Sequence, residues 1–170
     1  MKIIVFLGYS NSGKTYAIVS VVEELSRRGM RVGTLKHIHE LDFTIDTEGK
    51  DTWRHASAGA STVVALAPKE LTIIEKGDTS LTTIDDLVGI FTERRIDYLM
   101  VEGLYRRLSR RRGVVRVLCA RTKAEALELL KVHPRPVCVI SSGGIGGPLI
   151  EGLPLLRLPG DLDRLMELIG

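Results

Sequence analysis

Apolar runs and helical patterns alternate along this chain, and the alternation predicts an α/β fold. Residues 2–7, KIIVFL, form a nearly unbroken apolar run, as expected of a strand that is buried on both faces. Residues 14–28 then show helical spacing, because the apolar positions from Ile18 to Leu25 fall on one face. Gly29 follows as a natural C-terminal stop. The chain is therefore expected to begin with a buried strand and an amphipathic helix.

The same alternation continues to the end of the chain. We expect further strands at 31–36, 61–66, 71–75, 97–103, 114–120 and 136–141, and helices near 51–58, 82–94, 123–131 and 162–169. The second and third of these strands are separated only by APKE, which suggests a hairpin. Repeated strand and helix units predict a mostly parallel central sheet with helices on both faces, in one domain over residues 1–170. A ligand then belongs at the carboxyl ends of the strands.

Composition excludes several classes of protein. The chain has 170 residues, of which 44% are hydrophobic and 26% are charged, so it is neither disordered nor a membrane protein. The opening MKIIVFLG is too short for a signal peptide and runs into a glycine-rich turn instead of a cleavage site. No stretch approaches the roughly 18 apolar residues that span a bilayer. We therefore expect a cytoplasmic protein with no membrane partner.

The two cysteines are expected to be structural. Cys119 and Cys138 each lie within an apolar run, and neither belongs to a Cys-x-x-Cys motif or a Cys/His cluster. Cysteines in such runs are typically buried and packed like small apolar side chains. We predict two buried strand cysteines and no metal or redox site around them.

A glycine-rich motif follows the first predicted strand. GYSNSGKT, residues 8–15, fits G-x-x-x-x-G-K-[ST] and has a strand before it and a helix after it. Gly8 and Gly13 let the backbone bend so that successive N–H groups point at phosphate oxygens, and the helix dipole adds to their effect. Lys14 can reach the β- and γ-phosphates, and the Thr15 hydroxyl can ligate Mg²⁺. We expect a three-layer P-loop nucleotide-binding fold.

Magnesium needs a carboxylate at a neighbouring strand end, and the sequence offers a candidate. DYLMVEG is an apolar strand that ends in Glu102 and Gly103. Glutamate replaces the commoner aspartate, so a water-mediated or base-like contact is as consistent with the sequence as direct ligation. The alternative is a solvated glutamate at the end of a strand.

The segment LKHIHELDFTIDTEGKDTWRH, residues 35–55, leaves the tip of the next predicted strand and has few apolar residues. In this place we expect a switch or substrate loop beside the phosphates. Asp42 and Asp46 are then candidates for contacts to Mg²⁺, and Lys36 and Lys50 are candidates for contacts to phosphate. An ordinary surface loop is the alternative.

Two histidines in this segment suggest another possibility. His37 and His39 alternate along a strand end and are expected to face the same side. A His-x-His pair can bind a transition metal, but no third soft ligand lies nearby in the sequence.

The motifs together resemble the molybdopterin-guanine dinucleotide biosynthesis protein B family, MobB. GYSNSGKT, TLKHIHELDFTIDTEGKDTWRHASAGA and VEGLYRR follow one another in that family's order, over residues 8 to 103. The resemblance implies GTP and Mg²⁺ as ligands, at most a slow GTPase, and a homodimer. It also implies partnership with the MobA-type guanylyltransferase that attaches GMP to molybdopterin, and molybdopterin itself is a further candidate ligand.

The resemblance also assigns roles by position. The expected nucleotide-binding residues are Asn11, Ser12, Gly13, Lys14, Thr15 and Lys50. Thr15, Asp46 and Glu102 are expected near the metal, and Asp46 and Glu102 are the candidates for catalysis. The adjacent surface is expected to include His37, Asp51 and Arg54.

Two later segments leave alternatives open. Thr122-Lys123-Ala124-Glu125 stands roughly where GTPases carry a guanine-reading motif, but Thr-x-x-Glu before an apolar helix is also a capping box. SSGGIGG, residues 141–147, follows the last predicted strand. It offers backbone contacts to the base, a second anion site or a flexible loop.

Basic residues are concentrated in one part of a chain whose net charge is only +3. Between residues 106 and 123 they occur without a carboxylate: Arg106, Arg107, Arg110, Arg111, Arg112, Arg116, Arg121 and Lys123. Such a cluster favours an anionic partner. For Arg106–Arg112 the readings are a solvated loop, a site for a pterin phosphate, or a contact to an acidic partner face. Few aromatics lie among these arginines, which argues against nucleic acid.

Our interpretation is a GTP-binding adaptor in molybdenum cofactor biosynthesis that assists molybdopterin guanine dinucleotide formation. Hydrolysis is expected to be weak and Mg-dependent, because no water-positioning glutamine and no assured arginine finger are evident. Two alternatives remain from the residues. One is a small-molecule kinase that uses the arginines of 106–112 as a lid, and the other is a metallochaperone GTPase that uses His37 and His39.

Overall fold

The computed structural model describes residues 1–108, 111–131 and 135–170. The chain forms two compact units. The first consists of Met1–His37 and Ile84–Gly170, and the second is the intervening segment Ile38–Thr83. The first unit contains a seven-stranded sheet, and the second contains a two-stranded sheet.

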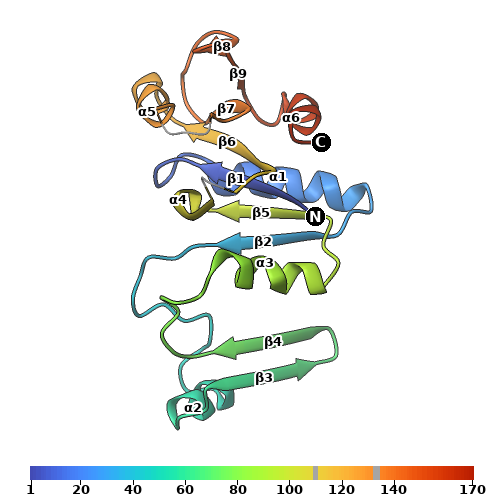
Figure 1. The fold of residues 1–170 in the computed structure, drawn as a ribbon, viewed down its shortest axis with the longest axis vertical. Coiled ribbons are helices and arrows are strands. Elements are labelled where there is room, and N and C mark those ends of the chain that lie inside the picture. Colours follow the sequence, from blue (N-terminus) through green and yellow to red (C-terminus); the bar gives the residue numbers. More distant parts are fainter. Residues whose placement is uncertain (109–110, 132–134) are drawn as a thin grey trace. The chain divides into compact units, whose positions relative to one another are not determined.

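The large sheet has the strand order β2-β5-β1-β6-β7-β9-β8 (Figure 1). Its strands are β1 (Lys2–Leu7), β2 (Val32–Lys36), β5 (Tyr98–Glu102), β6 (Val114–Ala120), β7 (Cys138–Ser141), β8 (Leu149–Ile150) and β9 (Leu153–Leu156). All neighbours pair in parallel except β8 and β9, which are antiparallel. The predicted mostly parallel α/β sheet is confirmed, and β5 lies between β2 and β1.

Two short strands were not predicted. Strands β8 and β9 are joined by Glu151 and Gly152, whose φ values of 48° and 72° are both positive. Two positive φ values in a two-residue loop are typical of the turn that matches the twist of a hairpin. The sequence there lacks the usual Asn-Gly or Asp-Gly signal, and the strands are too short for periodicity to identify them.

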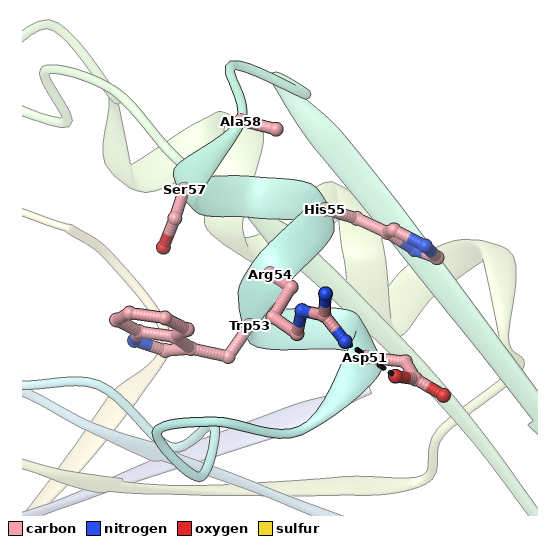
Figure 2. A pocket seen from close by; sticks show the side chains of 6 residues that line it. All are labelled: Asp51, Trp53, Arg54, His55, Ser57 and Ala58. Atoms are coloured by element: carbon pink, nitrogen blue, oxygen red, sulfur yellow. Dashed lines mark ion pairs between the residues drawn. The ribbon is translucent and has the colours of Figure 1, made fainter.

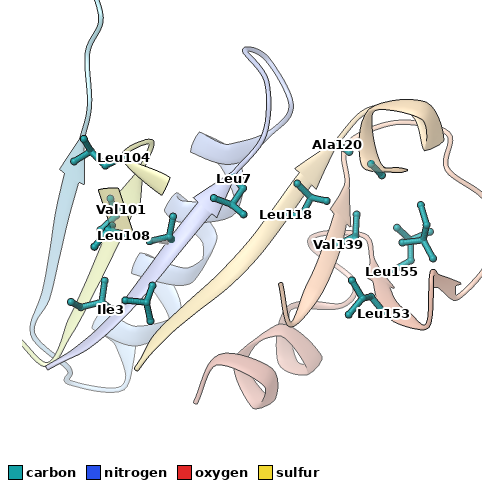
Figure 3. Close-up of a cluster of buried hydrophobic side chains, with 14 of the residues drawn as sticks. Ile3, Leu7, Val101, Leu104, Leu108, Leu118, Ala120, Val139, Leu153 and Leu155 are labelled. Atoms are coloured by element: carbon teal, nitrogen blue, oxygen red, sulfur yellow. The ribbon is translucent and has the colours of Figure 1, made fainter. Parts of the chain in front are cut away.

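Alternate residues of β1 contribute to two different cores, which explains its unbroken apolar run. Ile3, Val5 and Leu7 pack on one face of the sheet, and Ile4 and Phe6 pack on the other. Figure 3 shows the first of these cores, where side chains from several neighbouring strands gather over one face of the sheet. After Lys2 at its start, this strand has no polar positions, because neither side meets water.

Helices cover both faces of this sheet. They are α1 (Lys14–Arg27), α3 (Ile84–Glu93), α4 (Tyr105–Leu108), α5 (Lys123–Leu129) and α6 (Leu162–Ile169). Apolar residues of α1 and α6 join the core that contains Phe6, and those of α3, α4 and α5 join the core that contains Leu7. The helices predicted from spacing are confirmed, whereas the short α4 was missed. Among the described residues, no helix is long and apolar enough to cross a membrane.

The second unit consists of a helix and a hairpin. It contains α2 (Asp51–Ser57), β3 (Thr62–Ala67) and β4 (Glu70–Glu75), and the two strands pair antiparallel, which confirms the predicted hairpin. Val64 faces Ile73, and Leu66 faces Leu71. These four aliphatic side chains are 48% to 83% exposed, so one face of the hairpin presents apolar surface to solvent.

Both cysteines are buried, as predicted. Cys119 on β6 and Cys138 on β7 have no exposed surface, and both are free thiols in the core that includes α1 and α6. Burial raises the pKa of each thiol to about 12, because the thiolate loses its hydration there.

We expect both thiols of the native protein to resist a disulfide reagent at pH 8. A pKa of about 12 leaves on the order of one thiolate in ten thousand at that pH, and access is blocked as well. Reaction should be at least about a hundredfold slower than for a free cysteine and should become fast in guanidinium chloride. Because the folded pKa exceeds the unfolded one, the buried thiols should also cost stability as pH rises from about 8.5 toward 12. Rapid labelling of native protein would contradict this burial.

Candidate functional site

The loop between β1 and α1 has no room for side chains at its two outer glycines. A β-carbon on Gly8 would lie 2.4 Å from the carbonyl oxygen of Cys119, and one on Gly13 would lie 2.8 Å from Cβ of Ser142. Both glycines also have positive φ, 148° and 88°. The loop therefore curves tightly over the ends of neighbouring strands, in a conformation that other residues would not adopt.

The inner residues of the loop present hydrogen-bond donors. No side chain among the described residues caps the N-terminus of α1, so its first N–H groups remain available. Ser12 is buried, and its hydroxyl has no hydrogen-bond partner in the described part of the chain. Lys14 Nζ donates to the carbonyl oxygen of Tyr9 at 2.6 Å, and Asn11 takes the left-handed conformation that asparagine tolerates, with φ 58°. Free donors, a helix N-terminus and an ammonium group fit a phosphate.

The structure brings together two residues that the sequence placed far apart. Thr15 Oγ1 donates to Glu102 Oε2 at 3.3 Å across 87 residues of chain. Glu102 ends β5, which pairs directly with β1, and its side chain is only 17% exposed. A hydroxyl beside a carboxylate supplies the oxygen ligands that Mg²⁺ prefers. Thr15 and Glu102 therefore fit the predicted metal site.

Lys36 lies beside Glu102. Its Nζ is 3.8 Å from Glu102 Oε1, so the lysine predicted for phosphate contacts the strand-end carboxylate. The backbone N–H of His37 donates to the carbonyl oxygen of Glu102 at 3.0 Å, which extends the pairing of β2 and β5 by one residue. The second strand thus holds Glu102 in place through both its side chain and its backbone.

Asp46 organises the loop of the second unit that leads into α2. Its Oδ1 accepts hydrogen bonds from Thr52 Oγ1 at 2.8 Å and from the N–H of Thr47 at 2.9 Å. Its Oδ2 is buried and has no partner in the described part of the chain. Lys50 is exposed at the residue that precedes α2. The metal role of Asp46 and the phosphate role of Lys50 stay predictions.

Helix α2 carries a shallow hollow of about 650 Å³, lined by Asp51, Trp53, Arg54, His55, Ser57 and Ala58 (Figure 2). Arg54 pairs with Asp51 at 3.9 Å, and the two side chains are 71% and 88% exposed. An ion pair that is this open to water contributes little to stability. Figure 2 shows Trp53 and His55 pointing to opposite sides of the helix. Asp51 and Arg54 are open to solvent, and their place on the surface adjacent to the nucleotide stays a prediction.

Among the described residues, the fold brings no third metal ligand to the two histidines. His37 ends the first stretch of the first unit, and His39 lies in the second unit. Within the described ranges, no three side chains of His, Cys, Asp or Glu gather into a group that could hold a metal ion. The structure therefore adds no observation in favour of a His-x-His metal site.

Carboxylates from outside residues 106–123 contact two arginines of the basic cluster. Arg111 pairs with Asp85 of α3, and Arg121 pairs with Glu125 at 2.6 Å. Arg110 lies outside the described residues. Carboxylates that are absent from the local sequence therefore reach two of the arginines, one from a distant helix and one from the next turn.

The same contacts settle what the Thr-x-x-Glu motif does in this structure. The N–H of Glu125 donates to Thr122 Oγ1 at 3.2 Å, which caps α5. The carboxylate of Glu125 accepts from the N–H of Arg121 at 2.9 Å and from its guanidinium at 2.6 Å. The hydrogen bond from Arg121 lowers the pKa of Glu125 and raises that of the arginine. Of the two alternatives, helix capping is observed.

One contact of the loop had no signal in the sequence. The Tyr9 hydroxyl donates to Glu128 Oε1 of α5 at 2.7 Å, and this hydrogen bond is the main cause of a raised tyrosine pKa. The partners are 119 residues apart. Tyr9 occupies an unspecified position of the loop motif, and Glu128 belongs to no recognisable motif. The bond joins the glycine-rich loop to the helix that follows β6.

Among the described residues of the basic cluster, Arg116 is buried. It lies on β6 and is 9% exposed, and loss of hydration lowers its pKa. Its guanidinium donates to the carbonyl oxygens of Val114 at 2.8 Å and of Leu108 at 2.9 Å. Leu108 ends α4, the short helix that follows Glu102 and Gly103. Arg116 thus fixes the backbone next to the candidate site.

A G-x-x-x-x-G-K-T loop between the first strand and first helix of a mostly parallel sheet is typical of P-loop α/β proteins, and this chain has that arrangement. Residues 3–140 match the family described as molybdopterin guanine dinucleotide synthesis protein B. The chain belongs to this family, MobB, as the order of its motifs suggested.

Named relatives support the same assignment. A Haemophilus influenzae protein called molybdopterin-guanine dinucleotide biosynthesis adapter protein is 38% identical over 96 residues, which are 56% of this chain and 53% of that protein. The Escherichia coli K12 protein of the same name is 30% identical over 104 residues, which are 61% of this chain and 59% of its own length. The chain spans about half the length of the curated relatives it matches.

Solved structures share the fold. Bacillus subtilis MobB superposes with a TM-score of 0.78 at 25% identity and covers 100% of this chain and 99% of its own. A MobB homologue from Bacillus stearothermophilus gives a TM-score of 0.70 at 24% identity, and the match covers 99% of this chain and 98% of that one. The second likeness concerns the fold alone.

We expect Arg116→Met to destabilise the protein by about 2 kcal/mol, because the buried carbonyl oxygens of Val114 and Leu108 would lose their donor. Urea unfolding followed by circular dichroism measures this loss. Arg112→Met removes an exposed arginine from the same segment and should change stability by less than about 0.5 kcal/mol. Equal effects of the two substitutions would contradict a specific role for Arg116.

Proposed function

We propose that this protein is a nucleotide-binding adaptor that binds Mg·GTP at the loop of residues 8–15 and assists the attachment of GMP to molybdopterin. The pair formed by Thr15 and Glu102, beside an uncapped helix N-terminus, is the observation that carries the proposal. Membership of the MobB family and the names of its relatives support the pathway. We further propose that both units act together as one nucleotide-binding domain.

The phosphates would be held by the backbone N–H groups of the loop, by the Ser12 hydroxyl and by Lys14. Lys14 would exchange the carbonyl oxygen of Tyr9 for a phosphate oxygen, which is the stronger, charge-assisted acceptor. Thr15 and Glu102 would hold Mg²⁺, directly or through water. When bound, the ion neutralises phosphate charge. Lys36, on the neighbouring strand β2, would help to orient Glu102.

Hydrolysis by this site should be slow or absent. The sequence contains no glutamine to orient an attacking water. Glu102, one candidate for a catalytic base, already contacts Thr15 and Lys36. Arg111 and Arg121 are paired with carboxylates, so neither is ready to act as an arginine finger. A nucleotide-dependent adaptor fits these residues better than a fast catalyst does.

Partners of the protein are proposed from family membership and from one surface. The partner enzyme would be a MobA-type guanylyltransferase, consistent with the word adapter in the names of the relatives. A homodimer is supported by the exposed apolar face of the hairpin, formed by Val64, Leu66, Leu71 and Ile73. Apolar surface of this kind on a small unit is typical of an interface.

Calorimetric titration tests the nucleotide proposal. The wild-type protein should bind Mg·GTP in preference to Mg·ATP, and Lys14→Ala should weaken binding by at least about a hundredfold because a charged phosphate contact is lost. Glu102→Gln should reduce the dependence of the affinity on Mg²⁺. Lys69→Ala, at the exposed turn of the hairpin, serves as the control and should bind normally. Preference for ATP, or no nucleotide binding at all, would refute the proposal.

Sedimentation velocity tests the dimer. Leu66→Asp combined with Ile73→Asp should shift the protein to monomer, because two charges would be buried in an apolar contact. Leu149→Asp changes an equally apolar, 55% exposed side chain on β8 and should leave the assembly unchanged. A wild-type monomer at micromolar concentration, or a double variant that stays dimeric, would show that the hairpin face is not the interface.

A further inference from the structure

Lys36 and Glu102 are register partners at the ends of two neighbouring strands. Lys36 ends β2 and Glu102 ends β5, and the two residues pair in parallel register. Two positions earlier, Thr34 pairs with Met100, which belongs to the core that includes α1. Because side chains alternate along a strand, Lys36 and Glu102 both project on the face of the sheet that α1 covers. The ammonium and the carboxylate therefore meet at the end of α1 that carries Thr15.

The backbone around Lys36 is fixed, whereas its side chain can turn. The N–H of His37 donates to the carbonyl oxygen of Glu102 at 3.0 Å, and a β-carbon on Gly103 would lie 3.1 Å from His37 Cβ. The Lys36 side chain is 59% exposed, and its ammonium lies 3.8 Å from Glu102 Oε1. An ion pair this long and this open to water is weak. The flexible four-carbon stem can therefore carry the charge elsewhere at little cost.

The Lys36 ammonium and a divalent cation compete for the same carboxylate. Oε2 of Glu102 accepts from Thr15 at 3.3 Å, and Oε1 faces Lys36. A metal ion on Thr15 and Glu102 would be repelled by the neighbouring ammonium, because both carry positive charge. A triphosphate reverses this balance, since its negative oxygens attract the lysine and the metal ion alike.

We propose that Lys36 is a positioning residue that admits Mg²⁺ to Glu102 only together with the nucleotide. This inference rests on the proposed binding of Mg·GTP at Thr15, Glu102 and the loop of residues 8–15. Before the phosphates bind, Lys36 orients and neutralises the carboxylate and disfavours a metal ion there. When they bind, the Lys36 side chain turns from the carboxylate to a phosphate oxygen, which is the phosphate contact expected from the sequence. Binding of the metal ion and binding of the nucleotide thus become mutually dependent.

Manganese binding tests this role, because electron paramagnetic resonance measures the concentration of unbound Mn²⁺. Lys36→Met removes the charge and keeps an unbranched stem. It should tighten the binding of Mn²⁺ alone at least about tenfold, because the repulsion is gone. In calorimetry, the same variant should bind Mg·GTP at least about tenfold more weakly, because a charged phosphate contact is lost. A general structural defect would weaken both ligands, so the opposite signs identify the specific effect.

Three further variants serve as controls. Lys36→Arg keeps the positive charge and should restore the weak binding of Mn²⁺ alone. Glu102→Gln combined with Lys36→Met should lose the gained Mn²⁺ affinity, which places the ion at the carboxylate. Lys69→Met removes an exposed lysine from the hairpin turn and should bind both ligands as wild type does.

The inference is overturned if Lys36→Met binds Mn²⁺ no more tightly than wild type does, or if it keeps full affinity for Mg·GTP. Either result, obtained beside a wild-type protein that binds Mg·GTP, leaves the proposed function intact. A wild-type protein that binds no Mg·GTP overturns the proposed function, and this inference with it.

Discussion

The candidate site depends on the close approach of the glycine-rich loop to the ends of β6 and β7. A β-carbon at Gly8 would collide with the backbone of Cys119, and one at Gly13 would collide with Ser142. Because both positions lack side chains, the loop can curve over the strand ends and leave the N-terminus of α1 uncapped. The burial of Ser12 and the position of Lys14 follow from this curvature, and so does the contact between the phosphate loop and the loop after β7.

The second feature that determines the candidate site is the order of the strands in the large sheet. Strand β5 lies between β2 and β1, so Glu102 ends beside Thr15 on one side and Lys36 on the other. The carboxylate is therefore held by a hydroxyl and an ammonium group from two different segments. On the other side of β1, the ends of β6 and β7 form a backbone surface. The candidate metal residues thus lie on one side of the strand that carries the loop, and this backbone surface lies on the other.

Much of the fold could be predicted because local patterns carry it. In β1 nearly every residue is buried, which gives an unbroken apolar run. In α1 the buried residues recur with each helical turn, which gives the apolar spacing. The β8 and β9 hairpin was missed because its strands are too short to show periodicity and its Glu-Gly turn is uncommon. The contacts of the basic cluster could not be predicted for a different reason. The carboxylate of Asp85 comes from a separate helix, and Arg116 is inside the protein, so neither fact is visible in the local charge pattern.

By itself, the sequence determined the α/β class, the phosphate loop and the MobB family, because these depend on short-range patterns and on the order of motifs. It also identified Thr15 and Glu102 as separate candidates. Only the tertiary structure decided that they touch and that the loop after β7 lies against Gly13. Those relations follow from strand order and from steric fit between segments more than 80 residues apart. Such contacts produce no periodic pattern in a single sequence, because the tertiary fold and not the neighbouring residues determines which residues meet.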